Sequence, residues 1–127
     1  MLYAILCYDH EAVTGAWSQE EEDAVMGRLM TVQKGLEAEG RLGPVARLMP
    51  TTSATTLRKS AEEPLVIDGP FAETKEQFLG FYVVECENLD AALDVARDLA
   101  KANPGNGAYE IRPVMLYRPN ETKAETR

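Results

Sequence analysis

Residues 66–84 decide the fold, and they read Val66-Ile67-Asp68-Gly69-Pro70-Phe71-Ala72-Glu73-Thr74-Lys75-Glu76-Gln77-Phe78-Leu79-Gly80-Phe81-Tyr82-Val83-Val84. The stretch opens with β-branched residues, which are typical of a strand. Asp68-Gly69-Pro70-Phe71 breaks that strand, because glycine permits positive φ and proline fixes the bend. A loop or short helix runs on to Gln77. Residues 79–87 then form one of the two clearest strands of the chain.

The other clear strand opens the chain, where the apolar run from Leu2 to Tyr8 predicts a central strand covered on both faces. Ser18-Gln19-Glu20-Glu21 predicts a helix start, in which Ser18 caps free amides and Glu21 reaches back. The helix has apolar residues at the spacing of one buried face, and Gly40 is placed to end it. This face comprises Val25, Leu29, Val32 and Leu36, with Met26 and Met30 alongside.

Between this helix and residue 79 the sequence predicts short strands at 43–49 and 52–59. The second would form a hairpin with residues 64–67 at the sheet edge, with its turn at 60–63. After residue 87, Asn88 can cap a second helix, which Asn103-Pro104-Gly105 terminates. Its expected apolar positions are Leu89, Leu93, Ala96 and either Leu99 or Ala100. Residues 109–117 supply a last strand, and the chain from Asn120 onward is polar.

This order of elements indicates an α+β protein with a split β-α-β arrangement, an antiparallel sheet and both helices on one face. We expect one domain over residues 1–118 and a polar tail over 119–127. The other sheet face still needs cover. Association of two copies through their sheets would provide it, so we expect a homodimer.

Composition excludes several classes of function. The chain has 127 residues and a net charge of −8, which disfavours binding to nucleic acid or to a membrane. No secretory signal is expected at the start of the chain, and Cys7 and Cys86 fall inside predicted strands as small buried hydrophobes. These features predict a cytoplasmic protein. With one histidine and no Cys-x-x-Cys, a zinc site is not expected, and nothing indicates a cofactor.

The block at residues 66–84 resembles the hallmark of the DGPF group of YCII-related proteins. Further segments in the same order also fit that group. They are the first strand ending in Tyr8-Asp9, the strand at 54–58, the helix start at 88–92 and the closing residues 110–114. The resemblance covers residues 1 to about 115.

The resemblance implies a ferredoxin-like fold of the dimeric α+β barrel type, with a pocket near the DGPF loop. In the wider group a His and Asp pair is suspected of catalysis. This chain has Met26 and Leu29 where those relatives carry a helical histidine, so that pair does not carry over. Some DGPF proteins are associated with extracytoplasmic-function sigma factors.

His10, Asp68 and Glu73 are the candidate proton-transfer residues. His10 follows the first strand, and Asp9 or Asp68 could be its partner; adjacent strand residues point to opposite faces, however, so Asp9 and His10 are not expected to share a pocket. Asp68 could equally have a structural role, by hydrogen-bonding backbone amides of the turn. Phe71 could pack against the core and hold the loop in place. Glu76 is interpreted as a solvated charge. The candidate ligand-binding residues are Tyr8, Asp9, Gly69, Pro70, Phe71, Lys75 and Tyr82.

Two functions stay open at this point. The first is binding or transformation of a compact metabolite, with Lys75 holding an anionic group. The alternative is a non-catalytic regulatory module linked to a sigma factor, in which apolar surface would be exposed for a protein partner.

Overall fold

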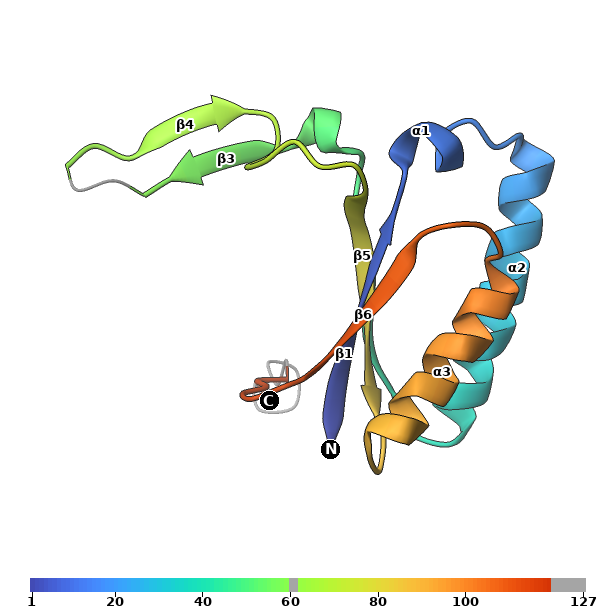
Figure 1. The fold of residues 1–127 in the computed structure, drawn as a ribbon. Coiled ribbons are helices and arrows are strands. Elements are labelled where there is room, and N and C mark those ends of the chain that lie inside the picture. The colour runs from blue at the N-terminus through green and yellow to red at the C-terminus, as the bar shows by residue number, and fades with distance from the viewer. Residues whose placement is uncertain (60–61, 120–127) are drawn as a thin grey trace, which may run out of the picture.

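The fold is that of a computed structural model, which describes residues 1–59 and 62–119 (Figure 1). Its elements are β1 (Leu2–Asp9), α1 (Glu11–Thr14), α2 (Gln19–Ala38), β2 (Leu42–Arg47), the 3-10 turn η1 (Thr51–Ser53), β3 (Thr55–Arg58), β4 (Leu65–Asp68), β5 (Gln77–Glu85), α3 (Leu89–Ala102) and β6 (Ala108–Pro113).

The main sheet has four strands in the order β2-β5-β1-β6, and all three pairings are antiparallel. Each helical crossover, α2 and α3, leads from a central strand to an edge strand. This is the ferredoxin-like topology that the sequence predicts. Figure 1 shows α2 and α3 side by side on one face of the sheet, as expected.

The helices begin where local sequence predicts. Ser18 Oγ accepts a hydrogen bond from the Glu21 amide at 3.1 Å, and Glu21 Oε1 accepts one from the Ser18 amide at 2.8 Å. Asn88 Oδ1 accepts from the Ala91 amide at the start of α3. Because these contacts span only three residues, the sequence alone specifies them.

The core lies between the helices and one face of the sheet. It contains Tyr3 and Ile5 from β1, and Tyr82 and Val84 from β5. The helices contribute Val25, Leu29, Leu36, Ala92, Val95 and Leu99. Two expected members, Met30 and Leu89, lie on the solvent side and are half-exposed.

Alternation along the strands assigns the residues of the opposite face. Tyr3 and Ile5 point to the helices, so Leu2, Ala4 and Leu6 point away from them, as do Phe81 and Val83 of β5. Neither helix covers this face, which we call the open face.

Strands β3 and β4 correct the prediction of a hairpin at the sheet edge. They pair only with each other and form a separate two-stranded sheet. This hairpin, the arm, projects from one end of the main sheet on the side of the open face (Figure 1). Local sequence predicts the strands, but it does not determine which sheet they join. Residues 60 and 61 of the expected turn lie outside the described residues.

Two further boundaries differ from expectation. α1 lies between the first strand and the helix that starts at Ser18, where no helix was expected. β6 ends at Pro113, before the expected residue 117, because its partner β1 begins at Leu2, and the Val114 amide still donates to the Leu2 carbonyl at 2.9 Å. After β6 the chain passes to the open-face side (Figure 1), where Met115 is fully exposed. The tail from Asn120 onward lies outside the described residues. Among the described residues, no helix is long and apolar enough to cross a membrane.

Candidate functional site

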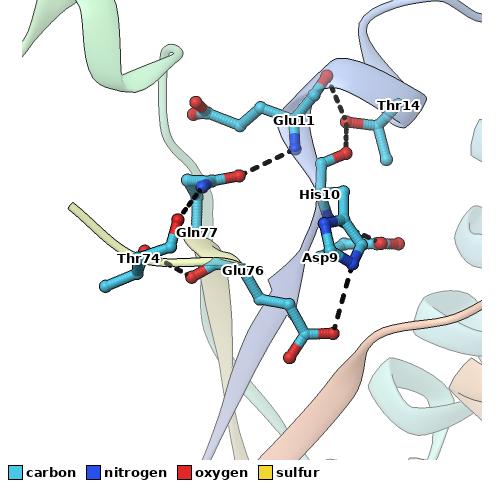
Figure 2. A network of polar contacts seen from close by, with 7 residues as sticks. All are labelled: Asp9, His10, Glu11, Thr14, Thr74, Glu76 and Gln77. Atoms are coloured by element: carbon cyan, nitrogen blue, oxygen red, sulfur yellow. Dashed lines mark hydrogen bonds and ion pairs between the residues drawn. The ribbon is translucent and has the colours of Figure 1, made fainter.

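The pairing of β1 with β5 brings His10 to Glu76. Asp9, the last residue of β1, pairs with Gln77, the first residue of β5, so the residues flanking this pair meet at one end of the sheet. His10 Nε2 lies 3.9 Å from Glu76 Oε2. The two side chains are 33% and 36% exposed, which leaves both accessible from solvent. Figure 2 shows them reaching toward each other from the two strands.

A chain of hydrogen bonds fixes the loop that carries Glu76 (Figure 2). The Glu11 amide donates to Gln77 Oε1 at 2.9 Å, and Gln77 Nε2 donates to the Thr74 carbonyl at 2.8 Å. Thr74 Oγ1 in turn donates to the Glu76 carbonyl at 2.6 Å. The backbone on both sides of the His10–Glu76 pair is therefore joined through side chains.

Glu11 also ties the site to the start of the arm. Its carboxylate accepts from the Thr51 amide at 2.8 Å and from Thr51 Oγ1 at 2.6 Å. Thr51 begins η1, which leads directly into β3. Sequence reasoning missed Glu11, because its partner lies forty positions away and no local motif joins them.

The His10–Glu76 pair is equipped for proton transfer. A neutral imidazole can take a proton from a bound molecule, and a facing carboxylate stabilises the imidazolium that forms. A separation of 3.9 Å is longer than a hydrogen bond, so Nε2 can still contact a ligand. Catalytic contacts of this kind often tighten only when a substrate binds.

Asp9 faces a different environment from His10. Its Oδ1 accepts from the His10 amide at 2.7 Å, and the residue lines a cavity of about 150 Å³ that His10 does not line. Burial raises the pKa of Cys7 and of Tyr109, both in the same cavity, to about 12. The Cys7 thiol is therefore neutral at physiological pH. A side chain at Gly107, whose φ is 117°, would also collide with Asp9 and the Tyr8 carbonyl.

Asp68-Gly69-Pro70-Phe71, the DGPF segment, connects β4 of the arm to the loop before β5, and we call it the DGPF joint. Its hydrogen bonds differ from those expected. The Gly69 amide donates to the Ala54 carbonyl at 2.7 Å, and Thr56 Oγ1 donates to the Gly69 carbonyl at 2.8 Å. Gly69 has a φ of 110°, which requires glycine. Among the described residues no hydrogen bond to the Asp68 side chain is found, so the expected bonding of the turn by Asp68 is wrong.

Phe71 corrects a second expectation. Its side chain is 71% exposed and does not pin the loop to the core. The Arg58 guanidinium instead lies 4.9 Å from the centre of its ring. The segment that follows is a loop, so the alternative of a short helix before Gln77 is also wrong.

The other predicted residues fall in separate places. Glu73 and Lys75 are exposed on the loop before β5, next to Pro70 in the same connection. Tyr8 packs against Phe78 with ring centres 5.6 Å apart, and its hydroxyl donates to Glu110 Oε1. Tyr82 is buried under the helices, where burial raises its pKa. Tyr8 and Tyr82 thus lie on opposite sides of the sheet.

Sequence comparison now identifies the family. The model of the YCII-related domain matches residues 1–118. The chain belongs to the YCII-related family. An uncharacterised protein of Rhizobium meliloti (strain 1021) is similar to it, with 62% identity over 121 residues, which cover 95% of this chain and 98% of that protein. These findings confirm the resemblance seen in the sequence.

In this YCII-related chain, α2 is the helix on which the histidine of the suspected catalytic pair would lie. Its residues at that place, Met26 and Leu29, are apolar. Leu29 is buried in the core and Met26 packs against it. The histidine of this protein instead follows β1 and meets Glu76, a residue interpreted from sequence as a solvated charge. Among the described residues, no three His, Cys, Asp or Glu side chains are grouped to hold a metal ion.

A second hollow lies between the helices, away from His10. It is an open groove of about 660 Å³ between α2 and α3. Charges of both signs line it, among them Arg28, Arg41, Asp94, Asp98 and Lys101. None of the candidate site residues belongs to it.

Proposed function

We propose that this YCII-related protein is a homodimer that binds a compact metabolite at the end of the main sheet, with His10 and Glu76 as its proton-transfer pair. The observation that supports this proposal is the His10–Glu76 contact itself. Two titratable side chains from distant parts of the chain face each other, remain accessible and are held by an ordered network.

The metabolite would carry an anionic group next to an acidic proton. Lys75 immediately precedes Glu76 and supplies an ammonium on the same loop. His10 would accept the proton from one atom of the bound molecule and return it to a different atom of the same molecule, and Glu76 would stabilise the imidazolium formed in between. Such a cycle needs no group beyond these side chains.

The test is a thermal-shift screen of purified protein against metabolites with carboxylate or phosphate groups. A true ligand raises the melting temperature of wild type, and this rise falls at least threefold in His10→Gln and Glu76→Gln. The control is Glu87→Gln, an exposed carboxylate two residues beyond the other end of β5. Because the chain has one histidine, its imidazole NMR signal reports binding directly. A ligand that stabilises all variants equally and leaves this signal unmoved would place the site elsewhere.

The exposed apolar arm supports a second candidate, a regulatory module that contacts an extracytoplasmic-function sigma factor. Leu57 and Val66 are the side chains available for such a contact. This candidate requires a purified sigma factor to bind wild type and His10→Gln equally, with loss of binding in Val66→Lys. Equal binding by Val66→Lys, or no binding at all, would reject it.

A further inference from the structure

The arm lacks the support that two-stranded sheets need. It consists of two four-residue strands, and among the described residues its ladder is the four pairs Thr55↔Asp68, Thr56↔Ile67, Leu57↔Val66 and Arg58↔Leu65. An isolated hairpin of this kind is marginally stable in water and normally packs on another element. Among the described elements, the main contacts of β3 and β4 are with each other.

Both faces of the arm carry exposed apolar side chains. Leu57 and Val66 form a cross-strand pair on one face and are 59% and 65% exposed. Leu65 and Ile67 lie on the other face and are also exposed. Clustered apolar exposure of this kind marks a contact surface in proteins of this size.

A second apolar surface lies on the same side of the molecule. The open face presents the half-buried Leu6 and Phe81, and the segment after β6 adds the exposed Met115 and Leu116. Figure 1 shows the arm and this segment on the side of the sheet opposite the helices. One chain therefore carries a projecting apolar arm and an apolar sheet face that point the same way.

We infer that the arm of each copy packs against the open-face side of a second copy, and that this contact sets the position of Glu76. This inference rests on the dimer of the proposed function and adds which segment of the partner completes the site. A two-fold axis lets each arm meet the other copy's sheet, so both apolar surfaces are covered at once.

Both ends of the arm lead to the His10–Glu76 pair. The β3 end connects through Thr51 to the Glu11 carboxylate. The β4 end connects through the loop 69–76, which Thr74 and Gln77 fasten to the Glu11 amide. An arm held by a second copy therefore restrains the loop that carries Glu76 from both sides.

The first test uses the double variant Leu57→Lys/Val66→Glu. These residues oppose each other across the strands, so the new charges pair and the hairpin is preserved. The matched control is Met30→Lys/Leu89→Glu, which places the same charges at half-exposed positions on α2 and α3. Sedimentation equilibrium of wild type and control should give twice the chain mass of 14.0 kDa. The arm variant should dissociate at least 100-fold more readily, and its single histidine signal should move.

The second test needs no substitution. In a dimer mixed from isotope-labelled and unlabelled wild type, isotope-filtered NOEs should join Leu57 and Val66 methyl groups to protons of the other copy's β1 or β5. An undiminished dimer in the arm variant, or absence of these NOEs, would overturn the arm contact while the dimer of the proposed function stands. An unmoved histidine signal in the dissociated variant would overturn the link to Glu76. Monomeric wild type would overturn the dimer and the inference together, and the metabolite screen would still judge the site.

Discussion

The two hydrogen bonds between the Glu11 carboxylate and Thr51 give the sharpest prediction for the site. Replacing Glu11 with alanine removes two hydrogen bonds to a carboxylate, at 2.8 Å and 2.6 Å, and leaves the Thr51 amide and hydroxyl without this partner. A hydrogen bond to a charged group contributes about 1.5–3 kcal/mol when well protected. Glu11 and Thr51 are half-buried, so we expect each bond to contribute about 1 kcal/mol. The variant Glu11→Ala should therefore lower the free energy of unfolding by about 2 kcal/mol.

A double-mutant cycle isolates the hydroxyl bond. Thr51→Ala removes Oγ1 but keeps the amide bond, so it should cost about 1 kcal/mol alone and almost nothing in the Glu11→Ala background. Urea unfolding at one fixed protein concentration measures all four proteins. Glu37→Ala, at an exposed position in the last turn of α2, is the control and should stay within about 0.5 kcal/mol of wild type.

Amide hydrogen exchange tests whether the Glu11–Thr51 hydrogen bonds stabilise the base of the arm. The Gly69 amide, which donates to Ala54 at the base of the arm, should exchange faster in Glu11→Ala than in wild type. The Ala91 amide at the α3 cap should not change beyond the global loss of stability. A coupling energy within about 0.3 kcal/mol of zero, with unchanged exchange at Gly69, would refute the reasoning.

Three further predictions follow from individual contacts. Thr56→Val should lower stability by about 1 kcal/mol, whereas Asp68→Ala should leave the melting temperature unchanged, since the DGPF joint is held through Thr56. Leu99→Ala, at a fully buried position, should cost about 3 kcal/mol in urea unfolding, against less than about 0.5 for the half-exposed Leu89→Ala. The pKa of Cys7 is raised by burial from 9.0 to about 12, so unfolding releases its proton and stability falls as pH rises between these values. Cys7→Ala should flatten that fall, and an identical pH profile would contradict it.

The sequence predicts most of the main sheet and both long helices, because their signals are local. Ser18 finds its partner three residues away, and so does Asn88. The long strands β1 and β5 are so apolar that their composition alone predicts central positions in the sheet, whichever strands they pair with. The arm could not be predicted as a separate sheet, because pairing depends on which edge is free in three dimensions.

The sequence predicts His10 as a site residue, but its contact with Glu76 escapes prediction for a related reason. His10 and Glu76 meet only through the register that pairs Asp9 with Gln77. A shift of one residue would turn these side chains to opposite faces, and no local pattern specifies the register. Glu76 therefore has the sequence context of a solvated charge, while the Asp68 side chain, in the recognisable motif, makes no hydrogen bond among the described residues.

The most recognisable motif of the chain, the DGPF segment, thus has a structural role at the base of the arm. Gly69 takes a conformation that other residues avoid, and its amide and carbonyl are held by Ala54 and Thr56 across the base of the arm. These contacts set the direction in which the arm leaves the body and the path of the loop that leads to Glu76. If the arm packs on a second copy, the motif transmits that contact to the His10–Glu76 pair. A substitution at Gly69 should then weaken dimerisation and shift the His10 NMR signal together, although Gly69 belongs neither to the proposed apolar contact nor to the His10–Glu76 pair.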